Sequence, residues 1–431
     1  MRVGDGMGSR ESSKRLDEMD DEVISQEVSR RHFLRGVAAV ALAHSALGSA
    51  QDASRRMKSR RTRAYVGTYT GSVGSGSNGE GIYSFDVNEA TGELIGRKLA
   101  AKTPDPSWIA IHPSKKYLYA VNEVSDYKGD SGSVSAFGID EASGELSALN
   151  VVSSEGAGPC YLSIDASGSY AFAANYGGGT IAVLPIRDDG SLGAATDVHR
   201  DSGHLGRPQA VDAPNGSYAV SGHDAPHAHM IAPDPQGNFA LATDLGQDRI
   251  YTYRFDRRTG KLNPADRATF ASLPSGDGPR HFAFHPNGHW IYAIQEEASN
   301  IVLFDYDAAI GSLSPRQTIS ALPSGFAGTS FASEILVSLD GKFLYAANRL
   351  HDSIAAFSIG VDGTLRWIGE TSTMGDYPGQ CRIDPSGNFL YACNRRSDSI
   401  TCFRIHRDTG QLVFTGQYTA VGSPASITFL A

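Results

Sequence analysis

Residues 278–306 read GPRHFAFHPNGHWIYAIQEEASNIVLFDY, and this stretch decides the fold because it contains one copy of a repeat that returns along the chain. Alternating apolar side chains predict three short strands, at 282–284, 290–294 and 301–305. The segment HPNG at 285–288, between the first two, has the composition of a tight turn. The pattern therefore predicts antiparallel strands joined by short turns.

Two charged residues flank the first pair of these strands. Arg280 stands where the first strand begins, and Glu296 stands where the second one ends. Antiparallel pairing places the start of one strand beside the end of the next. Arg280 and Glu296 are therefore expected at the same edge of the sheet.

Two sequence marks recur with a period of about fifty residues, which is typical of repeated structural units. The first is Gly-x-Leu at the start of a predicted outer strand, and its seven copies begin at Gly92, Gly144, Gly190, Gly260, Gly311, Gly363 and Gly410. The second is a large apolar or aromatic residue within a β run, found at Tyr65, Tyr119, Phe172, Leu241, Tyr292, Tyr345 and Tyr391. Four short strands per unit at this spacing indicate propeller blades, whereas a two-sheet sandwich does not need such even spacing.

The two ends of the repeat region complement one another. Residues 64–69 (AYVGTY) have the pattern of a second strand, and residues 423–430 (SPASITFL) resemble the first strand that this unit lacks. Pairing them would close a ring and cover two exposed sheet edges. We therefore predict an all-β fold over residues 64–431: a seven-bladed β-propeller of four-stranded blades, closed by the C-terminal strand joining the N-terminal blade.

The composition of the 431-residue chain excludes some classes of function. With 40% hydrophobic residues, 48 Gly and 19 Pro, it fits a globular protein rich in turns. The formal net charge of -9, without a basic stripe in the repeat region, argues against nucleic-acid binding. The sequence does not determine the oligomeric state, and a monomer is the default expectation.

The N-terminal sixty or so residues differ in kind from the repeats. The segment SRRHFLR at 29–35 precedes the apolar run GVAAVALA at 36–43 and a small-residue end at Ala50. Twin arginines before a short apolar run predict a twin-arginine export signal over residues 1–50, with a buried N-terminal helix as the alternative. The run is too short for a stable membrane span. Residues 51–63 are expected to be a solvated basic linker, and the protein is expected in the periplasm or outside the cell.

The four cysteines, Cys160, Cys381, Cys393 and Cys402, show no metal-binding spacing. So few in a chain of this length do not make a disulfide framework. Buried thiols are expected, with one closed pair as the alternative.

One repeat interval is longer than the others. The excess falls around residues 200–228, which are rich in Gly, Pro, His and Asp and precede the innermost strand of the next unit. Long loops of this kind are either functional lids or surface insertions. The sequence leaves both interpretations open.

A ring of polar residues is predicted at one mouth of the propeller. When units are aligned on the turn glycines Gly237 and Gly288, His229 falls in register with Arg280, at the start of an innermost strand. Strand starts and the ends of neighbouring strands meet at one face. The predicted mouth comprises His229, Arg280, Glu123, Glu296, Arg349 and Arg395. Such a concave polar site suits a small anion.

Several polar residues near this mouth have a purely structural interpretation. The asparagines at strand ends are ordinary turn formers: Asn122, Asn175, Asn348 and Asn394. His112 and His285, which precede turn prolines in register, are interpreted as blade scaffolding. For Arg280, Glu296 and Arg349, the alternative to a functional role is a structural ion-pair network lining the channel.

The strings YVGTYT, PHAH, GPRHFAFHPNG, IYAIQEE and YAANRLHDSI, with repeated TGEL and TGQL turns, resemble the seven-bladed propeller lactonase family. That family includes propeller-type 6-phosphogluconolactonase and the fungal carboxymuconate-lactonising enzyme. The resemblance covers residues 64–431 and implies hydrolysis of a sugar lactone. It also implies that one His, two Arg and one Glu of the central cleft are functional: His229 or His227 of PHAH, Arg280 of GPRH, Glu296 of QEE and Arg349 of NRLHDSI. We take His229, Arg280, Glu296 and Arg349 as the predicted catalytic residues, and His227, Glu123 and Arg395 as predicted substrate-binding residues.

Lactone hydrolysis needs a base that activates water and a group that stabilises the oxyanion. Glu296 or His229 is predicted to take the proton and Arg280 to face the oxyanion. Arg349, through its planar fork, is predicted to hold an anionic group of the substrate. No G-x-S-x-G elbow occurs in the chain, which disfavours a covalent acyl-enzyme.

No cofactor and no metal are expected. A divalent cation such as calcium is the alternative, and its oxygen ligands would come from Glu123, Asn175, Asp244 and Glu296. No segment has the spacing of a dedicated ion loop.

The favoured function is hydrolysis of a sugar lactone, 6-phosphogluconolactone to 6-phosphogluconate. In the first alternative, a muconate-type cycloisomerase, the base takes a carbon-bound proton. In the second, a ligand-binding propeller has no chemistry, because fold does not fix function. The binding interpretation gains if Arg280, Glu296 and Arg349 are tied to one another and closed off from solvent. The enzyme interpretation predicts that alanine at Arg280 or Glu296 removes turnover and leaves thermal unfolding nearly unchanged.

Overall fold

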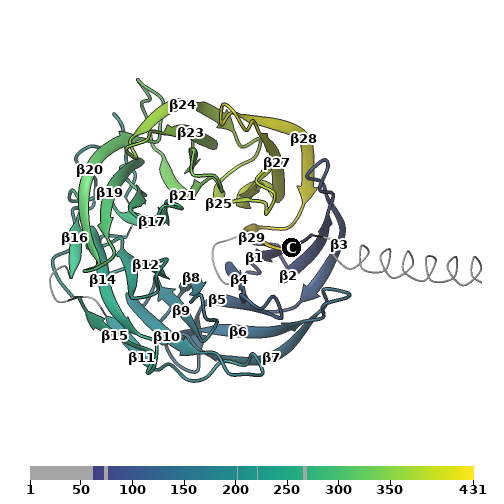
Figure 1. Cartoon of the computed structure of the whole chain (residues 1–431). Helices are drawn as coiled ribbons and strands as arrows, with labels where there is room; N and C mark the ends of the chain where they lie inside the picture. The colour runs from purple at the N-terminus through teal and green to yellow at the C-terminus, as the bar shows by residue number, and fades with distance from the viewer. Residues whose placement is uncertain (1–61, 72–75, 201, 221, 266–268) are drawn as a thin grey trace, which may run out of the picture. The chain divides into compact units, whose positions relative to one another are not determined.

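The computed structural model describes residues 62–71, 76–200, 202–220, 222–265 and 269–431. The predicted export signal and all of the predicted linker except its last two residues lie outside them. Within the described residues the chain forms seven antiparallel sheets set around a common axis (Figure 1). The seven-bladed prediction is therefore confirmed. No helix in these ranges is long and apolar enough to cross a membrane.

Each blade has four strands, ordered from the innermost to the outermost. Blade 1 consists of β29 (Pro424–Leu430), β1 (Arg63–Thr68), β2 (Ile82–Val87) and β3 (Leu94–Ala101). Blade 2 consists of β4 (Trp108–Ile111), β5 (Tyr117–Tyr127), β6 (Ser131–Ile139) and β7 (Leu146–Ser153). Blade 3 consists of β8 (Pro159–Ile164), β9 (Tyr170–Asn175), β10 (Thr180–Pro185) and β11 (Asp197–Arg200). Blade 4 consists of β12 (Ala228–Pro233), β13 (Phe239–Asp244), β14 (Arg249–Asp256) and β15 (Lys261–Pro264), and β16 (Phe270–Ser272) also pairs with β14.

The remaining three blades follow the same order. Blade 5 consists of β17 (Pro279–Phe284), β18 (Trp290–Gln295), β19 (Asn300–Asp307) and β20 (Ser312–Ser320). Blade 6 consists of β21 (Phe331–Val337), β22 (Phe343–Arg349), β23 (Ser353–Ile359) and β24 (Leu365–Ser372). Blade 7 consists of β25 (Pro378–Ile383), β26 (Phe389–Asn394), β27 (Ser399–Ile405) and β28 (Leu412–Ala420), with the short 3-10 helix η1 (Arg395–Ser397) after β26.

The C-terminal strand closes the ring as predicted. β29 is the innermost strand of blade 1 and pairs antiparallel with β1, with Ala64 opposite Phe429 and Tyr65 opposite Thr428. Figure 1 shows this yellow strand beside the purple start of the propeller. The pairing hides the backbone edge that each strand would expose alone. Arg63, which we assigned to the linker, is the first residue of β1.

The hydrophobic core is divided into layers between neighbouring blades. In one of them, Phe389 and Tyr391 of blade 7 pack against Phe85 and Ile427 of blade 1. The second strand of a blade is covered on both faces, and all six residues of β26, for example, are buried. Continuous apolar runs with small alanines suit such doubly covered strands.

The two repeating sequence marks prove to be the two halves of one contact between blades. In five blades the tyrosine hydroxyl of the second strand donates to the glycine carbonyl of the next blade's Gly-x-Leu: Tyr65 to Gly144 (2.6 Å), Tyr119 to Gly190 (2.9 Å), Tyr292 to Gly363 (2.8 Å), Tyr345 to Gly410 (2.9 Å) and Tyr391 to Gly92 (2.6 Å). Phe172 and Leu241 occupy the same place without a hydroxyl. Gly410 has φ +70°, and a Cβ there would lie 2.3 Å from the Phe343 ring, so the position requires glycine.

We expect Tyr345→Phe to destabilise the propeller without changing its chemistry. The Gly410 carbonyl would lose its donor inside the layer between blades, which costs about 1–3 kcal/mol. Urea unfolding measures the loss, and Tyr418→Phe is the control because Tyr418 is 56% exposed. Equal unfolding midpoints for the two variants would show that this hydrogen bond does not stabilise the ring.

The predicted scaffolding residues behave as scaffolding. Asn122 donates to Ser133 and Ser135, and Asn348 donates to the Ala321 carbonyl. Asn175 and Asn394 are likewise buried and hydrogen-bonded. The ring Nε2 of His112 lies 2.8 Å from the Gly168 carbonyl, and that of His285 lies 2.9 Å from the Gly341 carbonyl, so each joins its turn to the next blade.

All four cysteines are free thiols. Cys381, Cys393 and Cys402 are buried as expected, and Cys160 is partly exposed.

The insert before β12 packs on the loops of blades 4 and 5. His223 lies 3.1 Å from the Asp248 carboxylate, and Asn300 donates to Asp212 across 3.0 Å. Burial, followed by the Asp212 carboxyl, raises the pKa of Asp277 to about 9. Asp277 therefore stays protonated at neutral pH, which lets these two carboxyls approach each other inside the contact.

Candidate active site

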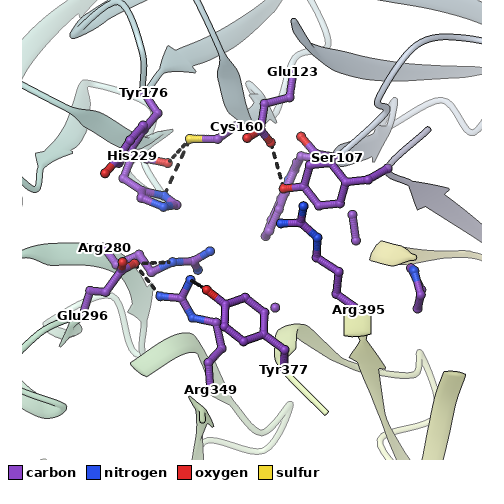
Figure 2. A pocket seen from close by; sticks show the side chains of 15 residues that line it. Ser107, Glu123, Cys160, Tyr176, His229, Arg280, Glu296, Arg349, Tyr377 and Arg395 are labelled. Atoms are coloured by element: carbon purple, nitrogen blue, oxygen red, sulfur yellow. Dashed lines mark hydrogen bonds and ion pairs between the residues drawn. The ribbon is translucent and has the colours of Figure 1, made fainter. Parts of the chain in front are cut away.

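A polar cavity of about 210 Å³ lies where the inner strands of the propeller converge (Figure 2). All seven blades contribute to its wall. The lining consists of Tyr69, Ser107, Trp108, Glu123, Cys160, Tyr176, His229, Arg280, Glu296, Arg349, Tyr377, Gly379, Arg395, Pro424 and Ala425. Residues more than three hundred positions apart in the sequence thus face one space.

Six of the seven predicted site residues line this cavity: Glu123, His229, Arg280, Glu296, Arg349 and Arg395. The seventh, His227, does not. Its ring stacks on Tyr176 with centroids 4.3 Å apart, Nδ1 lies 2.8 Å from the Tyr176 carbonyl, and Nε2 lies 3.0 Å from Asp224. His227 therefore supports the wall from behind, contrary to its prediction as a substrate-binding residue, and His229 is the histidine of PHAH that faces the cavity.

Arg280, Glu296 and Arg349 form one ion-paired group. Glu296 Oε2 lies 3.1 Å from Arg280 Nε and 2.6 Å from Arg349 Nη2. The register of β17 and β18 produces the first contact, because Pro279 is opposite Gln295. Burial and the neighbouring Arg349 lower the pKa of Arg280, while Glu296 opposes this shift. Both arginines remain cationic, so the group has a net positive charge.

Arg349 is held by the protein at several points. Besides Glu296, Nη2 donates to the Ala332 carbonyl at 3.3 Å and Nη1 donates to the Tyr377 hydroxyl at 3.4 Å. Burial tends to lower its pKa, but the Glu296 carboxylate outweighs burial and the pKa is raised. With its fork engaged in this way, Arg349 is poorly placed for the predicted role of gripping an anionic group of the substrate.

His229 is a neutral base within the cavity wall. It lies at the start of β12, and burial, followed by the nearby Arg280, lowers its pKa well below the usual value. Its Nδ1 is 3.7 Å from Cys160 Sγ, and its ring meets Tyr176 edge to face with centroids 5.6 Å apart. Burial also raises the pKa of the Cys160 thiol, so the thiol stays protonated.

The opposite wall contains a second carboxyl and a third arginine. Tyr69 donates to Glu123 Oε2 at 3.0 Å, and the Arg395 guanidinium lies over the Tyr69 ring, 3.8 Å from its centroid. Burial raises the pKa of Glu123, while hydrogen bonds from Ser107 and Tyr69 oppose the shift. Figure 2 shows this group facing Arg280, Glu296 and Arg349 across the cavity.

Sequence reasoning missed three tyrosines that line the site: Tyr69, Tyr176 and Tyr377. Tyr69 ends the YVGTYT string, and Tyr176 follows the strand-end Asn175, so the repeat pattern could have marked both. Tyr377 lies in the loop before β25 and has φ +63°, an uncommon conformation for a bulky residue. Its backbone N–H donates to Asp352 at 2.8 Å, which holds the ring in place. No repeat signal points to it.

The oxygens proposed for a cation do not gather. Asn175 and Asp244 are absent from the cavity wall, and Asp244 Oδ1 accepts the backbone N–H groups of His227 and Gln247. Across the described ranges, no three His, Cys, Asp or Glu side chains are grouped as a metal ion requires. Asn175 and Asp244 therefore do not belong to a shared cation site with Glu123 and Glu296.

The structure separates the two conditions set for a binding propeller. Arg280, Glu296 and Arg349 are tied to one another, which fits the ion-pair interpretation. They are not closed off, because all three line the cavity and their side chains retain 11%, 8% and 10% exposure. A charged network that faces an open polar cavity next to a neutral histidine is a candidate site for chemistry.

Comparison with known proteins gives a consistent result. A family profile described as "Lactonase, 7-bladed beta-propeller" matches residues 63–429. The 6-phosphogluconolactonase of Bacillus subtilis (strain 168) is 34% identical over 367 residues, which are 85% of this chain and 97% of the relative. The periplasmic gluconolactonase PpgL of Pseudomonas aeruginosa has a similar structure, with TM-score 0.77 and 31% identity over 86% of this chain and 99% of the other. A Lactobacillus plantarum protein matches with TM-score 0.76 and 29% identity, over 86% of this chain and all of the other.

Proposed function

The chain belongs to the seven-bladed β-propeller lactonase family, and from that premise we propose that it hydrolyses 6-phosphogluconolactone to 6-phosphogluconate. The observation that carries this proposal is the cavity in which a neutral histidine faces two arginines bridged by a carboxylate. Such a site can activate water and can also stabilise the anion that the attack creates. The Bacillus subtilis relative supports the choice of substrate.

His229 is the proposed general base. Because its pKa is lowered, it is neutral at neutral pH and can take a proton from water. The water oxygen then bonds to the lactone carbonyl carbon, and the carbonyl oxygen becomes an oxyanion. When the bond from this carbon to the ring oxygen breaks, His229 returns the proton to the leaving oxygen. The product is an open-chain hydroxy acid, which loses a proton to solvent.

Arg280 is the proposed oxyanion partner. Its Nε is bonded to Glu296, and this contact fixes the plane of the guanidinium. A charge-assisted donor that is already oriented costs no reorganisation when the oxyanion forms. Glu296, one of the two bases considered from sequence, accepts from both arginines through the same oxygen. Its proposed role is therefore to orient them, which leaves the proton transfer to His229.

The pH dependence of kcat/KM should reflect the low pKa of His229. The base form is the active form, so activity should persist as pH falls through the usual histidine range near 6.5 and should decline only at more acidic pH. Following product formation by NMR between pH 4 and 7, with the spontaneous rate subtracted, tests this, since about one pH unit covers a tenfold change in protonation. A loss of activity centred at the ordinary histidine pKa would contradict the assignment.

The reaction itself is tested by acid release from purified protein. The panel contains 6-phosphogluconolactone, unphosphorylated gluconolactone and a muconate substrate for cycloisomerisation. We expect opening of a sugar lactone well above the spontaneous rate. Conversion of the muconate alone would favour the cycloisomerase, and no conversion of any compound would favour a binding propeller.

We also propose that the protein is exported by the twin-arginine route to the periplasm or beyond. The proposal rests on the paired arginines at 30 and 31 ahead of a short apolar run. The description of the Pseudomonas aeruginosa relative as periplasmic supports it. Changing both arginines to lysine should retain the protein in the cytoplasm, as measured by cell fractionation. Unchanged export of this variant would contradict the route.

A further inference from the structure

A second cavity of about 390 Å³ adjoins the active site and shares Tyr377 and Arg395 with it. Arg396, Asp398 and Ser423 also line it. Resting on the lactonase function proposed above, we propose that Arg395 and Arg396 form a subsite for a terminal phosphate group of the substrate. The lactone ring would lie between His229 and Arg280, and the phosphate would point toward η1.

Both arginines of this subsite are positioned by aromatic rings. The Arg395 guanidinium lies 3.8 Å from the centroid of Tyr69, and the Arg396 guanidinium lies 3.9 Å from the centroid of Tyr377. Stacking on a ring face restrains a guanidinium and leaves its edge available for hydrogen bonds. Two restrained forks on adjacent residues suit the several oxygens of a phosphate monoester.

The electrostatics favour an anion at this place. At the catalytic end, one carboxylate already lies between Arg280 and Arg349. In the adjoining cavity, the Asp398 carboxylate accepts from Asn78 Nδ2 at 2.7 Å and from the Ser423 N–H at 2.8 Å, so its charge is directed at the loops that it joins. The Arg395 and Arg396 pair is therefore the best-placed positive charge for the remote end of a substrate.

The separation of the two ends fits a phosphorylated six-carbon lactone. Tyr377 lies between them, because the guanidinium carbon of Arg349 is 5.3 Å from its ring centroid and that of Arg396 is 3.9 Å from it. The left-handed backbone of Tyr377 holds the ring in this bridging position. A molecule that reaches from the catalytic arginines to Arg396 thus has to pass only one side chain.

The test compares binding of the two possible products, 6-phosphogluconate and gluconate, by calorimetry, with inorganic phosphate as a third ligand. The wild-type protein should prefer the phosphorylated product, and Arg396→Gln should weaken binding of that product about 10- to 100-fold, the value of a charged hydrogen bond. Binding of gluconate should be unchanged. Arg404→Gln is the matched control, because Arg404 also stacks on a ring, 4.5 Å from Phe389, on the same blade and away from both cavities.

Each outcome separates this subsite from the catalytic proposal. An unchanged preference in Arg396→Gln, or equal weakening of both products, would overturn the subsite. If inorganic phosphate binds and the phosphorylated product gains nothing, Arg396 binds free phosphate and the inference is wrong. Failure of the wild-type protein to open either lactone would refute the proposed function, and the binding comparison would still decide on the subsite.

Discussion

His229→Asn is expected to lower kcat by about 10²- to 10⁴-fold, the usual contribution of a general base. Asparagine retains a polar side chain in the cavity wall but cannot take a proton from water. His229 lies at the start of β12, and its change leaves the interlocking tyrosine contacts between blades untouched. The folded state should therefore survive. The measurement is the rate of opening of 6-phosphogluconolactone, corrected for spontaneous hydrolysis.

Two other histidines serve as controls for this variant. His285→Asn removes a contact with the Gly341 carbonyl between blades and should reduce stability while kcat is retained. His227→Asn tests the other histidine of PHAH and should have a smaller effect than His229→Asn, because His227 acts only through Tyr176. If His229→Asn kept more than about a tenth of the wild-type rate, which is a loss below the range for a general base, the assignment would be wrong.

Glu296→Gln is expected to impair both catalysis and stability. Without the carboxylate, two buried arginines face each other with no counter-ion, and breaking a buried ion pair in this way costs about 3–5 kcal/mol. Arg280 also loses the contact that orients it, and the loss of one oriented oxyanion donor lowers kcat by about 10²- to 10³-fold. Urea unfolding and lactone hydrolysis measure the two effects. The structure thus revises the expectation that unfolding would be nearly unchanged.

A double variant separates charge from catalysis at this site. Combining Glu296→Gln with Arg349→Met removes one of the two opposed cations and should restore part of the lost stability, whereas activity should stay low. The alanine expectation for Arg280 changes less, since Glu296 would still be paired with Arg349 at 2.6 Å. Full stability of Glu296→Gln would mean that water in the cavity compensates both arginines.

The fold could be predicted from sequence because each blade repeats the same physical requirement. A propeller needs a glycine with positive φ at each Gly-x-Leu and a large buried residue on each second strand, and these constraints recur at a fixed spacing. Gly410 and Tyr345 illustrate the point, since they meet in one hydrogen bond although they lie 65 residues apart. The predicted closure followed from the same logic, because β1 lacked an inner partner that only β29 could supply.

The site was predictable only where it follows strand register. Arg280 and Glu296 meet because of the hairpin between β17 and β18. Whether a residue faces the cavity or lies behind it depends on local geometry, so His227 and His229, two positions apart, could not be distinguished. Tyr377 depends on a left-handed backbone in an irregular loop, and no periodic signal marks it.

The roles of the arginines depend on partners that the sequence does not order. Arg349 and Arg395 both follow a second strand and looked equivalent. In the folded chain Arg349 is engaged by Glu296, Tyr377 and a backbone carbonyl, whereas Arg395 lies over Tyr69 at the junction of two cavities. Only the three-dimensional contacts distinguish an orienting arginine from one suited to bind substrate.

The central claim is that a sugar lactone is opened in the cavity formed by all seven blades. A crystal structure of the protein with bound 6-phosphogluconate tests it most directly. We predict the product carboxylate within hydrogen-bond distance of Arg280 and beside His229, and the phosphate against Arg395 and Arg396. A product bound outside this cavity, with Arg280 and His229 untouched, would contradict the account.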